Sequence, residues 1–272
     1  MKNLFILMLL CSSCARLSHI HETPLTEDSS EFKICFIGDT GTDAPEQSLV
    51  AKKLESEKCN KIYILGDLIY PNGIKNIDDP QLENKFLKHY LPLTSKGLNP
   101  TITVLMGNHD YRNDPAVWIE VSKKYPSIIY PSLYFMEKIG STCLVSLDSN
   151  LLRFFQKYGL ATEQSNWLDS IDGYLKKNCK TKIALSHHPY LSSGKHHGNS
   201  TGITKLFYEQ KILGKFDYLI SGHEHILSDE GEKNGTRLLI SGAAGNTDRG
   251  YKAGYILLKI KNGTSKYQII EL

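Results

Sequence analysis

The chain has 272 residues, of which 40% are hydrophobic, and its formal net charge is +3. A chain of this length and composition can bury a large core in one α/β domain. It contains no long run of Lys or Arg. The charge balance therefore gives no sign of a nucleic-acid-binding surface or of an acidic partner.

The N-terminus has the features of an export signal. A basic residue precedes the apolar run Leu4–Leu10, and small residues precede Cys14. This pattern predicts a signal peptide over residues 1–14, too short to span a bilayer as a mature helix. The pattern also resembles a bacterial lipoprotein signal with Cys14 as the lipidated residue. The alternative is a cleaved signal that leaves a soluble exported protein. We expect a periplasmic, membrane-anchored or secreted protein, with a flexible tether over 15–31 and the folded domain over 32–272.

Within 32–272, strand-like runs alternate with helical stripes, and strands follow one another towards the end. The predicted strands are Phe32–Ile37, Lys61–Leu65, Thr101–Met106, the hairpin Leu133–Glu137 with Thr142–Leu147, Lys182–Leu185, Tyr218–Ile220, Arg237–Ile240, Tyr255–Ile260 and Lys266–Ile270. Helical stripes lie at Leu49–Leu54, Leu82–Leu91, Val117–Val121, Trp167–Leu175 and 201–213. Asp43 with Glu46, and separately Thr162, give helix-capping signals. The order predicts mixed sheets covered by helices, with ligands bound at the carboxyl ends of strands.

Five short polar motifs punctuate this pattern, and four of them directly follow a strand-like run. They are Gly38-Asp39-Thr40-Gly41, Gly66-Asp67-Leu68-Ile69-Tyr70, Gly107-Asn108-His109-Asp110, Ser186-His187-His188-Pro189 and Gly222-His223-Glu224-His225. Carboxylate, amide, phenol and imidazole groups are thereby gathered at strand ends. Such a set can hold two metal ions side by side, an arrangement suited to displacement at phosphorus.

The first three motifs supply oxygen donors. Asp39 and Asp67 facing one crevice would repel each other, and a cation offsets that repulsion. The phenolate of Tyr70 is a hard anionic donor whose natural partner is ferric iron. Asn108 can offer its amide oxygen to a metal while His109, pointing elsewhere, acts as an acid catalyst.

The last two motifs supply imidazoles. Either His187 or His188 is expected to be a ligand, and the other to pack or to contact substrate. In a loop that crosses between two metals, His223 and His225 would each serve a different ion, and Glu224 is expected to face solvent. A Gly- and Ser-rich loop carries His196 and His197; we weigh a mobile surface loop equally against a substrate-binding role.

The cysteines beyond residue 14 fall into two kinds of context. Cys35 and Cys143 lie inside strand-like runs and are expected to be buried thiols. Cys59 and Cys179 each precede a strand, and export would permit a disulfide between them. Because no Cys pair has zinc-ligand spacing, the metal hypothesis rests on oxygen and nitrogen donors.

The motifs resemble those of the calcineurin-like metallophosphoesterases, and within them the purple acid phosphatases of the small tartrate-resistant type. That subgroup carries Asp-x-Gly, Gly-Asp-x-x-Tyr, Gly-Asn-His-Asp/Glu, Val-x-x-His and Gly-His-x-His. This chain departs at Ala184, where Val is usual, and at Leu68, where Asn is common. The resemblance implies an α/β fold built as a four-layer α/β/β/α sandwich: two mixed sheets flanked by helices, with the metal site at strand C-terminal ends.

The resemblance also implies roles for the motif residues. One ion, ferric iron, would be held by Asp39, Asp67, Tyr70 and His225. The other, a divalent Fe, Zn or Mn, would be held by Asp67, Asn108, His187 and His223. His109 would bind phosphate and protonate the leaving oxygen. The second outer histidine falls on His196 by spacing, or on His197 by the glycine that follows it.

The implied enzyme is a monomeric hydrolase that cleaves small phosphate monoesters by attack of a metal-bound hydroxide on phosphorus, at acidic pH. A metallophosphodiesterase acting on nucleotides or lipids is the alternative, against which Tyr70 argues, because such relatives mostly lack a Tyr ligand. A non-catalytic surface binding protein on the same fold is the alternative of another class. Such a protein should have lost ligands, and every matched ligand position is filled.

Overall fold

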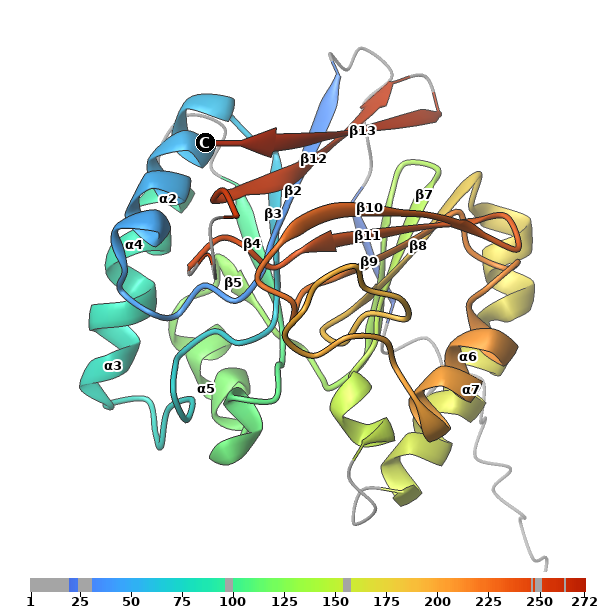
Figure 1. Ribbon diagram of the computed structural model, residues 1–272, viewed down its shortest axis with the longest axis horizontal. Coiled ribbons are helices and arrows are strands. Elements are labelled where there is room, and N and C mark those ends of the chain that lie inside the picture. Colours follow the sequence, from blue (N-terminus) through green and yellow to red (C-terminus); the bar gives the residue numbers. More distant parts are fainter. Residues whose placement is uncertain are drawn as a thin grey trace, which may run out of the picture.

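Two β-sheets lie face to face, with helices on both outer sides (Figure 1). The computed structural model describes residues 20–23, 31–95, 100–153, 158–245, 247, 251–261 and 263–272. The predicted signal peptide lies outside the described residues. None of the helices in the described ranges is long and apolar enough to cross a membrane.

The first sheet has six strands in the order β13-β12-β2-β3-β4-β5. Its parallel part, β2 to β5, carries the first three polar motifs at its carboxyl edge. β12 runs antiparallel to both of its neighbours. The strands are β2 (Phe32–Ile37), β3 (Lys61–Leu65), β4 (Thr101–Leu105), β5 (Ile128–Ile129), β12 (Gly254–Lys261) and β13 (Thr264–Glu271).

The second sheet has seven strands in the order β1-β6-β7-β8-β9-β11-β10. β7, β8, β9 and β11 are parallel, whereas β6 and β10 pair antiparallel with β7 and β11. The strands are β1 (Ile20–Thr23), β6 (Phe135–Ile139), β7 (Thr142–Ser146), β8 (Thr181–Ser186), β9 (Tyr218–Ser221), β10 (Leu227–Lys233) and β11 (Thr236–Ser241).

Helices cover the two outer faces of the sheets, α2 to α5 on the six-stranded sheet and α6 and α7 on the seven-stranded one (Figure 1). The helices are α2 (Pro45–Glu57), α3 (Pro80–Leu82), α4 (Lys88–Tyr90), α5 (Val117–Lys124), α6 (Tyr158–Asn178) and α7 (Gly202–Lys211). A π-helical stretch, Glu83–Leu87, joins α3 to α4, and 3-10 turns cover Leu91–Ser95, Asp110–Arg112 and Ser149–Leu152.

Alternating side chains on each central strand produce the layers. On β3, Ile62 and Ile64 pack against the helices, whereas Tyr63 and Leu65 face the other sheet. On β8, Ala184 packs towards α6 and α7 while its neighbours on either side join the core between the sheets. Strands buried on both faces read as continuous apolar runs, which is why the sequence predicted them well. The four-layer α/β/β/α sandwich is thus confirmed.

The sequence missed three strands at or near sheet edges. β10 (Leu227–Lys233) is mostly polar, β5 has two residues, and β1 falls inside the segment predicted to be a tether. Backbone pairing with β11, β4 and β6 holds these strands, so their side chains need not alternate.

Both predicted helix caps are wrong. The N-cap residue of α2 is Ala44, and it makes no side-chain cap. The carboxylate of Asp43 instead lies 2.6 Å from the ammonium of Lys88, so a partner distant in sequence replaces local capping. Thr162 lies inside α6, which begins at Tyr158.

The disulfide that export would permit between Cys59 and Cys179 does not form. The bonds join Cys35 to Cys59, with Cα atoms 6.0 Å apart, and Cys143 to Cys179, with Cα atoms 5.7 Å apart. Each bond links a strand to the residues just before the neighbouring parallel strand, β2 to β3 and β7 to β8. Cys59 and Cys179 belong to different sheets, so the strand cysteines that we expected to be free thiols are their partners.

Candidate metal centre

Three candidate ligands sit at the same local position, one glycine beyond the end of a strand. Asp39, Asp67 and His223 follow β2, β3 and β9, and their φ angles are +57°, +53° and +70°. Left-handed backbone is strained for residues with a side chain and is typical of functional sites. The preceding Gly66 is required for close packing, because a Cβ there would lie 2.5 Å from Nδ1 of His187.

The first donor cluster surrounds the phenol oxygen of Tyr70. That oxygen lies 3.0 Å from Oδ1 of Asp39, 2.9 Å from Oδ2 of Asp67 and 3.1 Å from Nε2 of His225. Oδ2 of Asp39 accepts the backbone N–H of His223 at 2.8 Å, which ties the two sheets together. Donors from β2, β3 and β9 therefore meet at one point.

The second cluster surrounds Nε2 of His187. This atom lies 3.0 Å from Oδ1 of Asn108, 3.2 Å from Nδ1 of His223 and 3.5 Å from Oδ1 of Asp67. Nδ1 of His187 donates to the carbonyl oxygen of Leu65 at 2.8 Å. Donation from Nδ1 leaves the lone pair on Nε2, which is the arrangement that metal-binding histidines use.

The electrostatics of the clusters fit bound cations. Burial, and then the negative charge of Asp67, raise the pKa of Asp39 well above its usual value. Burial and the two carboxylates likewise raise the pKa of Tyr70. Burial lowers the pKa values of His187 and His223, which favours neutral imidazoles. Buried carboxylates with neutral imidazoles form a donor set for positive ions of the first transition series.

His109 lies at the edge of the first cluster. Its ring centroid is 4.4 Å from that of Tyr70, and its Nε2 is 3.9 Å from Oδ2 of Asp67. Nδ1 donates to the carbonyl oxygen of Pro71 at 2.6 Å. The side chain is 20% exposed, so Nε2 can meet a bound molecule.

Asp110 holds the loops after β3 and β4 together, a role that the sequence analysis did not assign. Its carboxylate is buried and accepts the backbone N–H groups of Gly107 at 2.8 Å and Leu68 at 3.1 Å. Gly107 in turn lies against the Asp67 carboxylate, where no Cβ would fit. The only sequence signal was the place of Asp110 as the last residue of its motif.

His188, which the sequence left open as packing or substrate-binding, is buried behind the second cluster. Its Nδ1 lies 2.8 Å from Oγ of Ser149, and its ring centroid is 4.4 Å from that of His223. Nε2 of His188 has no hydrogen-bond partner in the described part of the chain. It forms a group of potential metal ligands with His187 and His223, all within 4.8 Å of one another.

His196 and His197 lie over the clusters on an exposed loop. The ring of His197 stacks on that of His223 at 4.0 Å between centroids, and the ring of His196 is 6.1 Å from that of His225. Glu224 does not face solvent as predicted. Only 1% of it is exposed, because His223, with its left-handed backbone, turns the chain and directs Glu224 under this loop.

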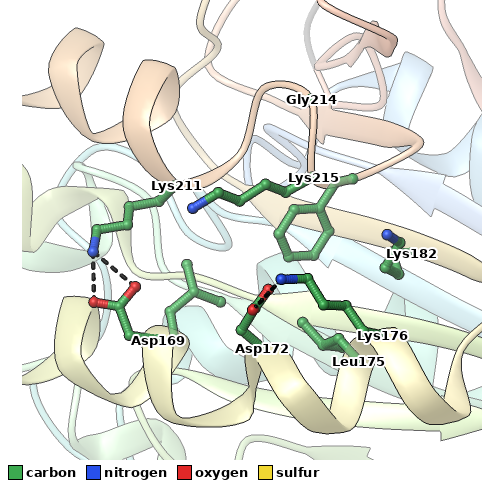
Figure 2. A pocket seen from close by; sticks show the side chains of 10 residues that line it. Asp169, Asp172, Leu175, Lys176, Lys182, Lys211, Gly214 and Lys215 are labelled. Carbon is green, nitrogen blue, oxygen red and sulfur yellow. Dashed lines mark hydrogen bonds and ion pairs between the residues drawn. The ribbon is translucent and has the colours of Figure 1, made fainter.

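A pocket of about 110 Å³ lies elsewhere, between α6, α7 and β8 (Figure 2). Its carboxylates are paired with lysines: Asp169 lies 2.6 Å from Lys211, and Asp172 lies 2.6 Å from Lys176. Lys182, at the beginning of β8, also lines it, whereas His187 follows the end of that strand. The pocket is therefore at the opposite end of β8 from the donor clusters and belongs to a different surface.

Comparison with known proteins identifies the family. The model of the calcineurin-like phosphoesterase family matches residues 32–227. The chain belongs to this family. The phosphoesterase is 28% identical over 258 residues to purple acid phosphatase 4 of Arabidopsis thaliana, covering 87% of this chain and 74% of that one. It is 25% identical over 205 residues to Fe(3+)-Zn(2+) purple acid phosphatase 12 of the same plant, covering 70% and 41%.

Solved structures share its fold. GAP50, described as the anchor in the inner membrane complex of Plasmodium, superposes with a TM-score of 0.72 at 17% identity, covering 89% of this chain and 85% of that one. A dimetal phosphatase from Danio rerio gives a TM-score of 0.62 at 10% identity, covering 88% and 96%. The family and the donor set identify this chain as a metal-dependent phosphoester hydrolase with a dimetal site.

Proposed function

We propose that this hydrolase is a phosphomonoesterase whose two metal ions share Asp67. The observation that carries the proposal is the position of the Asp67 carboxylate. Oδ2 lies 2.9 Å from the phenol oxygen of Tyr70, and Oδ1 lies 3.5 Å from Nε2 of His187. One carboxylate thus faces both donor clusters, as a shared ligand must.

The two clusters define the proposed ligand sets. Ferric iron would be held by Asp39, Asp67, Tyr70 and His225, because a phenol oxygen and carboxylates are hard donors. A divalent Fe, Zn or Mn would be held by Asp67, Asn108, His187 and His223. The Fe(3+)-Zn(2+) relative supports this pairing of a trivalent with a divalent ion.

The protein groups around the ions have separate tasks in the proposed reaction. When bound, the ions would supply positive charge to the phosphate oxygens and lower the pKa of water at the site. Because Nδ1 of His109 already donates to Pro71, its Nε2 is the atom that transfers a proton to the leaving oxygen. His196 and His197, whose rings lie near those of His225 and His223, would bind the phosphate oxygens.

A panel of phosphate esters tests the reaction. With metal-replete protein at acidic pH, we expect kcat/KM for an aryl phosphate monoester to exceed that for the matching bis-aryl ester by at least about ten-fold, as differential transition-state binding requires. Preference for the bis-ester would support the phosphodiesterase alternative. Hydrolysis of neither ester would support a non-catalytic binding protein on this fold.

The colour of the protein tests the ferric assignment. A Tyr70 phenolate bound to ferric iron should give the purified protein a visible absorption band, and Tyr70→Phe should remove it. Tyr111→Phe is the matched control, since the Tyr111 hydroxyl hydrogen-bonds Asp148 and not the donor clusters. A colourless wild type that contains two ions per chain would contradict the ferric assignment and leave a dimetal esterase.

We also propose that the protein is exported and monomeric, with the signal over residues 1–14, a linking segment up to residue 31 in which β1 pairs with β6, and the catalytic domain over 32–272. Its two disulfides fit an oxidising compartment. Intact mass measured on the mature protein distinguishes a lipid on Cys14 from a simple cleavage. An unprocessed chain with unmodified Cys14 would contradict export.

A further inference from the structure

Glu224 is a buried carboxylate between two candidate metal ligands. It stands between His223 and His225, and only 1% of it is exposed. A buried charge is costly unless it is well hydrogen-bonded, so the partners of this carboxylate show what it does.

Those partners are consecutive backbone N–H groups of the histidine loop, which we define as residues 192–200. Oε1 of Glu224 accepts from His197 at 2.6 Å and from Gly198 at 2.5 Å. Oε2 accepts from His196 at 3.4 Å. Hydrogen bonds from N–H groups to a carboxylate are the strong kind, so a single side chain holds three successive amides.

The histidine loop also packs around this carboxylate. A Cβ on Gly194 would overlap Oε2 of Glu224, so the absence of a side chain at Gly194 lets the loop approach. The rings of His196 and His197 are exposed to solvent, but their backbone is fixed from beneath. The turn that carries two candidate metal ligands and the loop that carries two outer histidines are therefore joined through one side chain.

We propose that Glu224 is a positioning residue that holds His196 and His197 over the dimetal site, where they bind the phosphate oxygens of the ester. This inference rests on the proposed function, because it assigns the two histidines to phosphate binding. Glu224 touches neither substrate nor metal. It acts through the backbone of the loop, so its loss should weaken phosphate binding while both ions stay in place.

Kinetics of three variants test the role. Glu224→Ala should raise KM for a phosphate monoester, and the Kd for inorganic phosphate, by about ten-fold or more, with a smaller change in kcat and unchanged metal content. Glu224→Gln, which keeps an oxygen for His197 and Gly198, should restore most of the affinity. Glu230→Ala is the control, because Glu230 bonds the hydroxyl of Ser193 in the same loop but not the histidine amides. Unchanged phosphate affinity, or loss of a metal ion, in Glu224→Ala would overturn the proposal.

A double-mutant cycle separates positioning from general destabilisation. Residues that act through one another are non-additive. In a His196→Ala/His197→Ala background, adding Glu224→Ala should change KM and the Kd for phosphate by less than about two-fold. A full ten-fold effect in that background would show that Glu224 works by another route and would refute the inference.

Amide hydrogen exchange provides a readout that needs no activity. In the wild type, the His197 and Gly198 amides should be protected, and Glu224→Ala should speed their exchange by about ten-fold or more, whereas Glu230→Ala should not. If the wild type hydrolysed no phosphate ester, the proposed function would fail. The exchange rates would still test whether Glu224 holds the histidine loop. Equal exchange in wild type and Glu224→Ala would overturn the positioning role.

Discussion

The two sheets contribute different chemistry to the same site. The loops after β2, β3 and β4 in the six-stranded sheet supply oxygen donors, Asp39, Asp67, Tyr70 and Asn108. The loops after β8 and β9 in the seven-stranded sheet supply the imidazoles, His187, His223 and His225. Each sheet alone carries an incomplete set, so the site depends on how the sheets pack.

The two sheets are held together by an apolar core and by hydrogen bonds beside the donors. The core between the sheets includes Tyr63 and Leu65 from one side and Ile183 and Leu185 from the other. The backbone N–H of His223 donates to Asp39, and Nδ1 of His187 donates to the carbonyl of Leu65. Hydrogen bonds between side chains and backbone therefore cross from one sheet to the other beside the donors themselves, and they fix the relative position of oxygen and nitrogen ligands.

Removing the charge of Asp67 should have the largest effect, because its carboxylate faces both donor clusters. Asp67→Asn should lower kcat/KM by on the order of a thousand-fold and reduce the metal content, since several kcal/mol of charge stabilisation is lost. Metal analysis and steady-state kinetics check this. A variant that kept both ions and more than a tenth of the activity would show that the two donor clusters do not depend on Asp67. It would contradict a shared ligand.

His109 follows β4 in the six-stranded sheet, and the effect of removing its side chain should depend on the substrate. His109→Ala should slow esters with poor leaving groups by about 10²–10⁴-fold, because the departing alkoxide loses its proton donor. Activated aryl esters, which leave without a proton, should slow much less. The measurement is kcat/KM across a leaving-group series; equal slowing of all esters would count against the acid role.

Each sheet contains one disulfide, and removing the two bonds separately tests whether the two sheets are equally stable. Cys35→Ala/Cys59→Ala and Cys143→Ala/Cys179→Ala open loops of 24 and 36 residues. Each pair should lower the free energy of unfolding by about 3 kcal/mol, because loop-closure entropy grows slowly with length. Urea unfolding measures both. A loss confined to one pair would show that the two sheets differ in stability as well as in chemistry.

A buried carboxylate at the junction of the two sheets should make stability depend on pH. Asp148, after β7, accepts a hydrogen bond at 2.5 Å from the hydroxyl of Tyr111, which follows β4 in the other sheet. Burial raises the pKa of Asp148 to about 6. The folded state therefore holds the proton more tightly than the unfolded state does. The protonated Asp148 stabilises the fold at low pH, and this contribution is lost as the pH rises through about 6.

Asp148→Asn removes this titration. Between pH 4 and 7, the free energy of unfolding of the wild type should fall by about 2 kcal/mol relative to the variant. Urea unfolding at several pH values measures the difference. Parallel pH profiles for the two proteins would refute the raised pKa of Asp148.

The sequence predicted what depends on local pattern and missed what depends on distant partners. Asp39, Asp67 and His223 each follow a strand and a glycine, so their common location was readable. The disulfide pairing was not, because the contexts of Cys59 and Cys179 match each other while their partners lie in strands far away in sequence. Glu224 was misplaced for a similar reason, since the loop that buries it lies 26 to 28 residues earlier.

Anomalous diffraction from crystals of the metal-replete protein tests the central claim most directly. The account predicts two metal peaks, one among Asp39, Tyr70 and His225 and one among Asn108, His187 and His223, with the Asp67 carboxylate bound to both. A single peak, or a second ion that takes no oxygen from Asp67, would contradict a site built by joining the two sheets.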